Sequence, residues 1–375
     1  MRVAFLGLRS PWGVEGGVEA SVAELAPRLA AAGVEVTVYC RDRYNPHGNC
    51  VRAGVRLVDA PTIYSRSAEA FVHTALVAPR AAMHHDVVHL HACGPALFTP
   101  IPLALGRKSV VTIHGKDWDR DKWGGIAKAV LRAGGWTAAN TAAEVIAVSQ
   151  SLADDIRALG PAPVTYIPNG TADHEPVAWD ASIFPMLRPR RYMLFVGRLV
   201  PEKGLDHLLR AVANARIETP VVITGGSSYT PAYVSRLHRD APPGIVFTGP
   251  RFGLEKRMLL SHARAFVFPS RMEGLPLALL EALAAGLPVV ASDIAPNQEV
   301  LGGLPGWRLP PDDVQAWTRA LREIDDADPA FLQAMGAPGV ARVRTEFGWE
   351  AVVRRTLDVY KRAVGERAGS AEACA

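Results

Sequence analysis

Short apolar runs alternate with longer segments of helical periodicity along most of the chain. Runs that are apolar at consecutive positions are typical of parallel strands buried on both faces. The segment between the first two runs has helical spacing and ends at Gly33, a suitable stop for a helix. We therefore predict a parallel sheet covered by helices in the first half. Its expected strands lie at residues 2–8, 34–40, 86–92, 109–115, 144–149 and 164–170.

The same alternation restarts after residue 191, following a Pro-bearing segment with a basic cluster at its end. A chain of 375 residues is long enough for two domains. We expect an α/β fold with two Rossmann-like domains, and strands of the second at residues 192–197, 220–226, 244–249, 265–270 and 288–293. The predicted division is residues 1–172, linker 173–191, residues 192–345, a basic amphipathic helix 346–366 and a loose tail 367–375.

Composition narrows the class of protein. Hydrophobic residues make up 49% and charged residues 21%, as in globular proteins. A net charge of +4, spread along the chain, fits an anionic small ligand or an acidic membrane surface better than nucleic acid. Four dispersed cysteines favour a reducing compartment, and the first residues resemble a strand more than a signal peptide. We expect a cytoplasmic protein, with peripheral membrane contact left open.

Ligands of open parallel sheets bind beyond the carboxyl ends of the strands, so residues after strands are the candidates for function. Gly16 and Gly17 follow the first strand and precede a helix, where glycine lets the backbone approach a phosphate. A flexible loop without a ligand is the alternative. The spacing is not G-x-G-x-x-G, so a dinucleotide cofactor is not supported.

Arg198 and Lys203 follow the strand at residues 192–197 and precede another helix. Two fixed cations at that place suit a diphosphate whose charge grows as a leaving group departs. The alternative is that Arg198 forms a surface pair with Glu202.

Glu273 follows the strand at residues 265–270, beside the backbone amides of Gly274 and Leu275. Pro276 suits the first turn of a helix that we expect to reach about Ala285. A carboxylate there can bind a ligand, or it can be present only because the helix dipole stabilises a negative charge at the N-terminus.

Glu281 lies inside that helix, roughly 7 Å along its axis from Pro276. The helix is apolar on nearly every side, so a buried carboxylate would need polar partners. A ligand hydroxyl, an exposed face or a structural arginine are the alternatives.

These motifs together resemble a known family. The E-x(7)-E pattern from Glu273 to Glu281, the segment 196–211 and the "GGVE" at residues 16–19 are similar to retaining glycosyltransferases of the GT-B fold, family GT4. The N-terminal half is most similar to bacterial enzymes that build cell-surface polysaccharides, including rhamnosyltransferase-like members.

The resemblance implies two Rossmann-like domains facing a cleft, with the donor sugar nucleotide held mainly by the C-terminal one. It also implies a final helix that returns to the first domain, and a histidine near the reacting sugar that matches His114. The implied donor contacts are Glu273, Gly274 and Leu275 with the sugar, Glu281 with the ribose, and Arg198, Lys203, Gly16 and Gly17 with the diphosphate.

The implied reaction is sugar transfer with retained configuration, without metal or cofactor, from a nucleoside-diphosphate sugar to a glycan, lipid-linked or small-molecule acceptor. Arg198 and Lys203 would stabilise the departing diphosphate. A sugar-nucleotide 2-epimerase of the same architecture and a non-catalytic sugar-nucleotide binding protein are the alternatives. The donor base, the sugar and the acceptor stay open.

Other patterns are weaker. Asp117, Asp119 and Asp121 alternate as in a calcium loop, but Lys122 and Lys128 occupy positions where such a loop needs glycine and glutamate. A histidine cluster on a buried strand is more often structural than zinc-binding. Aromatic and basic residues around position 123 suit either packing or a lipid-linked acceptor at a membrane. The clustered residues are His84, His85, His89 and His91, and then Trp118, Trp123, Trp136, Lys116, Arg120, Lys122, Lys128 and Arg132.

Overall fold

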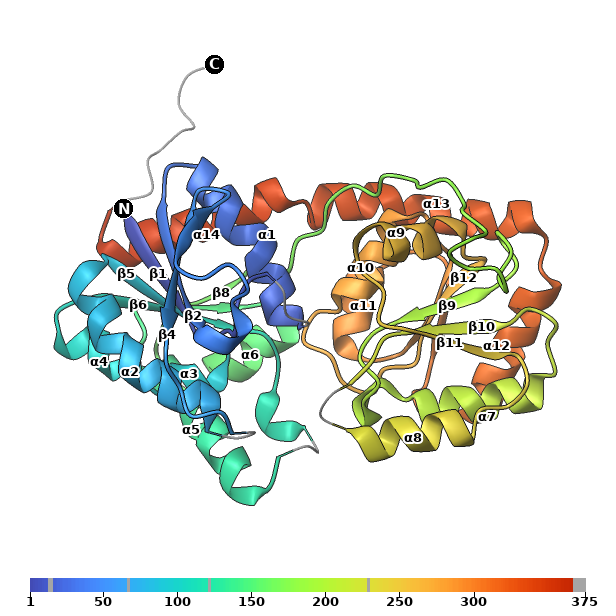
Figure 1. Cartoon of the computed structure of the whole chain (residues 1–375), viewed down its shortest axis with the longest axis horizontal. Helices are drawn as coiled ribbons and strands as arrows, with labels where there is room; N and C mark the ends of the chain where they lie inside the picture. Colours follow the sequence, from blue (N-terminus) through green and yellow to red (C-terminus); the bar gives the residue numbers. More distant parts are fainter. Residues whose placement is uncertain (13–15, 66–67, 121–122, 228–229, 367–375) are drawn as a thin grey trace, which may run out of the picture. The chain divides into compact units, whose positions relative to one another are not determined.

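The computed structural model describes residues 1–12, 16–65, 68–120, 123–227 and 230–366. Its contacts divide the chain into two compact units (Figure 1). Unit 1 comprises Met1–Gly170 and the segment from Trp349, and unit 2 comprises Thr171–Gly348. The segment predicted as a linker packs on unit 2, where the His174 ring lies 2.8 Å from the Ser261 hydroxyl.

Unit 1 is built on a sheet in the order β3-β4-β2-β1-β5-β6-β7-β8, parallel except for the β3–β4 hairpin. Buried consecutive positions such as Val3, Ala4 and Phe5 explain why these runs form covered parallel strands. The strands are β1 (Arg2–Leu6), β2 (Glu35–Arg41), β3 (Cys50–Arg52), β4 (Val55–Ala60), β5 (Val87–His91), β6 (Lys108–Ile113), β7 (Glu144–Ala147) and β8 (Val164–Tyr166). The helices are α1 (Gly17–Ala31), α2 (Glu69–His84), α3 (Cys93–Ala96), α4 (Pro100–Ala104), α5 (Gly125–Thr141), α6 (Gln150–Arg157) and α14 (Trp349–Val364).

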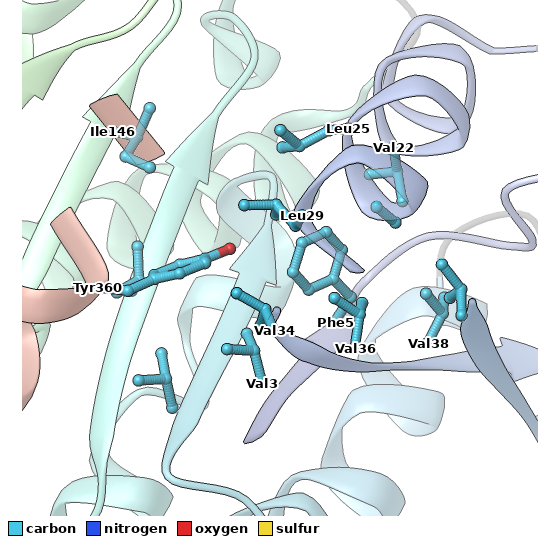
Figure 2. Close-up of a cluster of buried hydrophobic side chains, with 14 of the residues drawn as sticks. Val3, Phe5, Val22, Leu25, Leu29, Val34, Val36, Val38, Ile146 and Tyr360 are labelled. Atoms are coloured by element: carbon cyan, nitrogen blue, oxygen red, sulfur yellow. The ribbon is translucent and has the colours of Figure 1, made fainter. Parts of the chain in front are cut away.

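The core of unit 1 joins distant parts of the chain. Side chains of β1, β2 and α1 meet Tyr360 of α14 in one apolar cluster (Figure 2). The Tyr360 ring is fully buried, and its hydroxyl lies 2.7 Å from Nδ1 of His89. The last described helix therefore belongs to the first sheet, held by apolar burial and one buried polar contact.

Unit 2 repeats the architecture with a fully parallel sheet in the order β11-β10-β9-β12-β13-β14. The strands are β9 (Met193–Val196), β10 (Val221–Thr224), β11 (Ile245–Gly249), β12 (Ala265–Phe268), β13 (Val289–Ser292) and β14 (Trp307–Leu309). The helices are α7 (Leu205–Ala215), α8 (Pro231–Arg239), α9 (Gly253–His262), α10 (Leu277–Ala284), α11 (Ala295–Leu301), α12 (Val314–Asp326) and α13 (Pro329–Glu346).

The prediction of two Rossmann-like parallel sheets is confirmed. Three strands were missed, namely β3, β4 and β14. In β4 the buried Val55 and Leu57 flank the exposed Arg56, so the strand alternates and lacks the continuous apolar run that marks its neighbours. β3 and β14 have three residues each, which is too short for a clear pattern.

Candidate functional site

The sheet of unit 2 changes direction between β9 and β12. From β9 the strand order runs outward through β10 to β11, and from β12 it runs outward through β13 to β14. A ligand crevice is expected at the carboxyl ends of the two strands flanking such a reversal. Arg198 and Lys203 follow β9, and Glu273 follows β12, so the fold directs the predicted residues of both loops to this point.

Lys203 and Glu273 are in direct contact there. Nζ of Lys203 donates a hydrogen bond to Oε1 of Glu273. Their side chains are only 15% and 11% exposed, and the ammonium lies 4.9 Å from the centre of the Phe268 ring. A partly desolvated cation and anion therefore stand together where a charged ligand is expected.

Gly204 permits this approach. It adopts a left-handed conformation with φ of +65°, and a Cβ atom there would lie 2.1 Å from the carbonyl oxygen of Pro269. Only glycine lets the loop after β9 lie this close to the end of β12.

Arg271 ties the same two loops together. Its guanidinium donates to the Pro201 carbonyl at 3.2 Å, to Asp206 at 3.2 Å and to Asp312 at 2.8 Å. Burial raises the pKa of Asp206, but the hydrogen bond and charge of Arg271 outweigh it and leave that pKa below its usual value. Arg271 was not among the residues predicted from the sequence, although a basic residue two positions before Glu273 is a visible signal.

The helix after Glu273 begins one residue later than predicted. Pro276 precedes the first helical residue, and the Leu279 amide donates to the Pro276 carbonyl at 3.1 Å. Gly274 and Leu275 lie before this first helical hydrogen bond, in the turn that carries Glu273. The helix ends at Ala284.

Glu281 is less buried than the sequence suggested. Most of α10 is buried, but the Glu281 side chain is 31% exposed and accepts a hydrogen bond from Lys256 of α9 at 2.6 Å. The expectation of a buried carboxylate was therefore wrong, because the helix keeps one partly exposed side, whereas the contact of Glu281 with a ribose stays a prediction. A bound ribose would have to share Glu281 with Lys256 or displace Lys256 from it. Lys256 was not among the residues predicted from the sequence.

Unit 1 has its own reversal, between β1 and β5. Gly7 follows β1 with φ of +101°, and a Cβ there would lie 2.5 Å from the His91 carbonyl. Gly16 and Gly17 stand at the start of α1, as predicted. Apart from its chain neighbours and the backbone of its own helix, no described atom lies within 4 Å of a Cβ built on Gly17, so packing within the described residues does not require glycine there.

His114 is half-buried and forms a stack with the buried rings of His91 and His89 at the carboxyl ends of β5 and β6. Its Nε2 lies 3.1 Å from Nδ1 of His91, whose ring also stacks on His89 with 4.3 Å between centres. Burial lowers the pKa of His114 to about 4 and that of His89 to about 3. Both rings are therefore neutral at pH 7, and His89 is satisfied by Tyr360 and Thr112 at 2.7 Å each.

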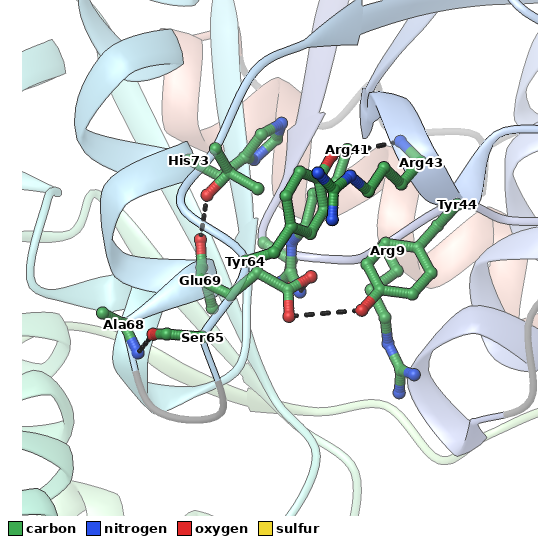
Figure 3. A network of polar contacts seen from close by, with 12 residues as sticks. Arg9, Arg41, Arg43, Tyr44, Tyr64, Ser65, Ala68, Glu69 and His73 are labelled. Carbon is green, nitrogen blue, oxygen red and sulfur yellow. Dashed lines mark hydrogen bonds and ion pairs between the residues drawn. The ribbon is translucent and has the colours of Figure 1, made fainter. Parts of the chain in front are cut away.

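A polar network occupies the same edge near β2 (Figure 3). Arg41, the last residue of β2, donates to Glu69 at 2.9 Å, and Tyr44 donates to the same carboxylate at 3.4 Å. The Arg43 guanidinium lies 3.9 Å from the centre of the Tyr64 ring. The network offers cationic and aromatic groups beside the end of the first sheet.

The weaker metal hypotheses gain no support. Asp117 and Asp119 are engaged by Arg120 at 3.1 Å and Arg132 at 3.8 Å, while Asp121 and Lys122 lie outside the described residues. Across the described ranges no group of three or more His, Cys, Asp and Glu side chains has an arrangement that could hold a metal ion. The absence of a metal requirement stays a prediction.

The structure thus brings Lys203 and Glu273 together in unit 2 and places Arg198, half-buried, at the end of β9. Glu281 lies on the neighbouring helix, and Gly16, Gly17 and His114 lie at the carboxyl edge of unit 1.

Comparisons with known proteins identify the class. The family model described as "Glycosyl transferases group 1" matches residues 190–326, and that described as "Glycosyltransferase Family 4" matches residues 15–174. The chain is 30% identical to the glycogen synthase of Mycobacterium tuberculosis, covering 98% of this chain and 96% of that protein. It is 29% identical to the α-maltose-1-phosphate synthase of the same organism, covering 96% and 99%.

Solved structures agree on the fold. Sucrose-phosphate synthase from Thermosynechococcus elongatus superposes with a TM-score of 0.82 at 22% identity, covering 96% of this chain and 98% of that one. HepE of Anabaena, solved in complex with UDP-glucose, gives 0.76 at 18% identity over 96% and 98%. The protein is therefore a glycosyltransferase with the GT-B fold. It belongs to glycosyltransferase family 4, and the relatives give no support to the epimerase alternative.

Proposed function

We propose that the protein transfers a hexosyl or deoxyhexosyl group from a nucleoside-diphosphate sugar with retention of configuration and without a metal ion. The observation that carries the proposal is the contact of Lys203 with Glu273 at the reversal of the second sheet. It puts a cation for the diphosphate next to a carboxylate for the sugar, which is the pairing a sugar nucleotide needs.

In this proposal Lys203 and Arg198 bind the diphosphate and stabilise the charge that develops as it leaves. Glu273 and the amides of Gly274 and Leu275 orient the sugar hydroxyls, and Glu281 accepts from the ribose. Fixed cations supply the charge stabilisation that metal ions give other transferases, which supports metal-independent transfer.

In this proposal the acceptor attacks from the face that the phosphate leaves, and a phosphate oxygen takes the acceptor proton. The neutral state of His114 at pH 7 suits a hydrogen-bond partner of the sugar and not a cation. Gly16 and Gly17 are proposed as diphosphate contacts because glycine at the start of α1 would let the backbone approach a phosphate closely.

The relatives guide the choice of substrates. Two similar proteins are named as synthases of glycogen and α-maltose 1-phosphate, and HepE was solved with UDP-glucose. We take a glucosyl nucleotide as the first donor to test and a glycan or sugar phosphate as the first acceptors. Rhamnosyl donors are also tested, because the N-terminal motifs resemble those of enzymes that build cell-surface polysaccharides.

The test is nucleotide release by the full chain from uridine, adenosine, guanosine and deoxythymidine diphosphate sugars, each with and without acceptors, read by mass spectrometry. We expect one donor to yield nucleotide and a glycosylated product in the presence of EDTA. The anomeric configuration of that product, read by NMR, tests retention. An epimerised sugar nucleotide without nucleotide release would contradict the transferase assignment, and binding without turnover across the panel would favour a non-catalytic protein.

A peripheral membrane contact is part of the proposal because apolar side chains are exposed on adjoining helices of unit 1. Ile126 and Trp136 of α5 are 86% and 56% exposed, and Leu103 of α4 is 54% exposed. Lys128 and Arg132 on α5 add positive charge, which suits an acidic lipid surface. None of the helices in the described part of the chain has the length and apolar composition to span a bilayer.

Flotation with vesicles of phosphatidylglycerol and phosphatidylcholine tests this contact. Wild type should float with the vesicles. The variant that combines Ile126→Ser with Trp136→Ser should remain in the bottom fraction, with unchanged circular dichroism. Equal behaviour of wild type with vesicles and without them would remove the membrane contact while leaving the transferase proposal intact.

A further inference from the structure

A cavity lies on the first sheet where its parallel strands begin. It has a volume of about 570 Å³ and is lined by Arg2 of β1, by β2 as far as Tyr39, by β3 and β4 and by the end of α2. The parallel strands of unit 1 begin here, whereas Gly7, Arg41 and His114 stand where they end. The cavity is therefore separate from the candidate site at the carboxyl edge of the same unit.

The lining of this cavity is strongly basic. It contains Arg2, Arg56, Arg80 and His84, against the single carboxylate of Glu35. Arg2 is neutralised by Asp86 at 2.8 Å. Arg56 and Arg80 form no salt bridge with any residue that the structure describes, so both guanidinium groups are available to an anion, and with Glu35 counted the lining keeps one excess positive charge.

Hydroxyl groups form the floor between these charges. Thr37 and Tyr39 point to the same side of β2, and they are 8% and 3% exposed. Neither hydroxyl belongs to the buried side-chain atoms that lack a partner among the described residues, and both residues line the cavity, where their hydroxyls are available to a ligand. Burial raises the pKa of Tyr39, and the nearby charge of Arg80 opposes that rise, so the phenol is neutral and can donate.

The helix end that borders the cavity does not repel an anion strongly. A helix C-terminus carries partial negative charge on its free carbonyls. The Ala81 carbonyl, however, accepts both the His85 amide and Nδ1 of His85, at 3.0 Å each. Part of the unfavourable dipole is thereby satisfied within the helix.

Two guanidinium groups outside any described salt bridge and two hydroxyls that line the cavity are groups that bind a phosphate. A volume of about 570 Å³ exceeds the space that one phosphate needs and falls in the range of small-molecule sites. Val51 and Val58 add an apolar wall. We infer that this cavity binds a phosphorylated small molecule of sugar-phosphate size, at a site distinct from the transfer site.

Calorimetry with the full chain tests the inference, using glucose 6-phosphate, inorganic phosphate and glucose as probes. Glucose 6-phosphate should bind with a stoichiometry of one in the presence of saturating UDP and at least tenfold more tightly than inorganic phosphate, and glucose should not bind. Arg56→Ala combined with Arg80→Ala should weaken binding at least tenfold. Both residues are exposed, so the variant should fold, and Arg157→Ala on α6 is the matched surface control.

Four results would overturn the inference. The first three are no binding of glucose 6-phosphate to wild type, equal affinity in the Arg56/Arg80 variant, and displacement of the probe by UDP, which would assign it to the donor site. Binding confined to vesicles with phosphorylated headgroups would likewise refute a small-molecule site. Because no readout depends on turnover, failure here is distinguishable from failure of the proposed function.

Discussion

Lys203 and Glu273 are separated by 70 positions in the sequence, yet they form a hydrogen-bonded ion pair at the reversal of the second sheet. Each comes from a loop that follows a central strand, and both side chains are largely buried. The hydrogen bond fixes the positions of both charged groups, which limits the reorganisation needed when a sugar nucleotide binds.

Removing either member of this pair should abolish most transfer. We expect Lys203→Ala and Glu273→Ala to lower kcat about 10²- to 10³-fold, as loss of a preorganised electrostatic contact does. Stability should fall by about 1–3 kcal/mol, because the remaining charge loses its buried partner. Turnover and urea unfolding measure the two effects. Arg239→Ala, which breaks an exposed pair with Asp240, is the control, and full activity in either site variant would refute the assignment.

Arg271 should act by positioning the two loops. Arg271→Lys keeps the charge but loses the fork that reaches Pro201, Asp206 and Asp312 together. We expect the KM for the donor to rise about tenfold with a smaller change in kcat, since Lys203 and Glu273 remain present. Steady-state kinetics with varied donor separates the parameters. A uniform loss of kcat at unchanged KM would indicate that Arg271 contacts the reacting groups instead.

The main course of the fold could be predicted because it depends on local patterns. Consecutive buried residues such as Val3 to Leu6 are consequences of strands covered on both faces, so the pattern appears in the sequence. The alternating β4 does not share it, because its Arg56 side faces the basic cavity. The order of the strands in the sheet also cannot be predicted from local patterns, and this order places β9 beside β12.

The site was predictable as residues following strands, but its partners were not. Glu281 depends on Lys256, and Arg271 depends on Asp312, which are 25 and 41 positions away. Such pairings follow from tertiary packing, so they cannot be predicted from the residue spacing within a strand or a helix. The degree of burial of Glu281 was misjudged for the same reason: α10 is apolar, but α9 leaves one side of it partly open.

Glu281 should contribute to recognition of the donor ribose. Glu281→Gln should raise the KM for a ribonucleotide donor about tenfold and leave that for the 2′,3′-dideoxy analogue nearly unchanged, because the analogue lacks the hydroxyls to be bound. Lys256→Ala is the control for loss of the 2.6 Å ion pair alone. Equal effects of Glu281→Gln on both donors would indicate a structural role.

The histidine stack should make unit 1 sensitive to acid. The folded-state pKa of His114 is about 4 and that of His89 about 3, both below the ordinary value of 6.5. Between these values the unfolded chain binds more protons, so their contribution to stability is complete above pH 6.5 and is lost as pH falls toward 4 and then 3. Each group contributes a slope of up to about 1.4 kcal/mol per pH unit.

Urea unfolding followed by circular dichroism at pH 7.5 and pH 5.0 measures this loss. His114→Asn should reduce the difference between the two pH values, whereas His84→Asn, at an exposed position, should not. An unchanged pH dependence in His114→Asn would show that other groups dominate the acid response.

A substitution of Gly17 tests ligand approach separately from folding. Apart from its chain neighbours and the backbone of its own helix, a Cβ there meets no described atom within 4 Å, so Gly17→Ala should unfold at the same urea concentration as wild type or slightly higher, since alanine favours the helix. If the backbone at this helix start approaches a diphosphate, the added methyl should raise the KM for the donor more than tenfold. Gly33→Ala, at a left-handed position after α1, is the opposite control and should lose stability with its donor KM unchanged. Unaltered kinetics in Gly17→Ala would place the diphosphate elsewhere.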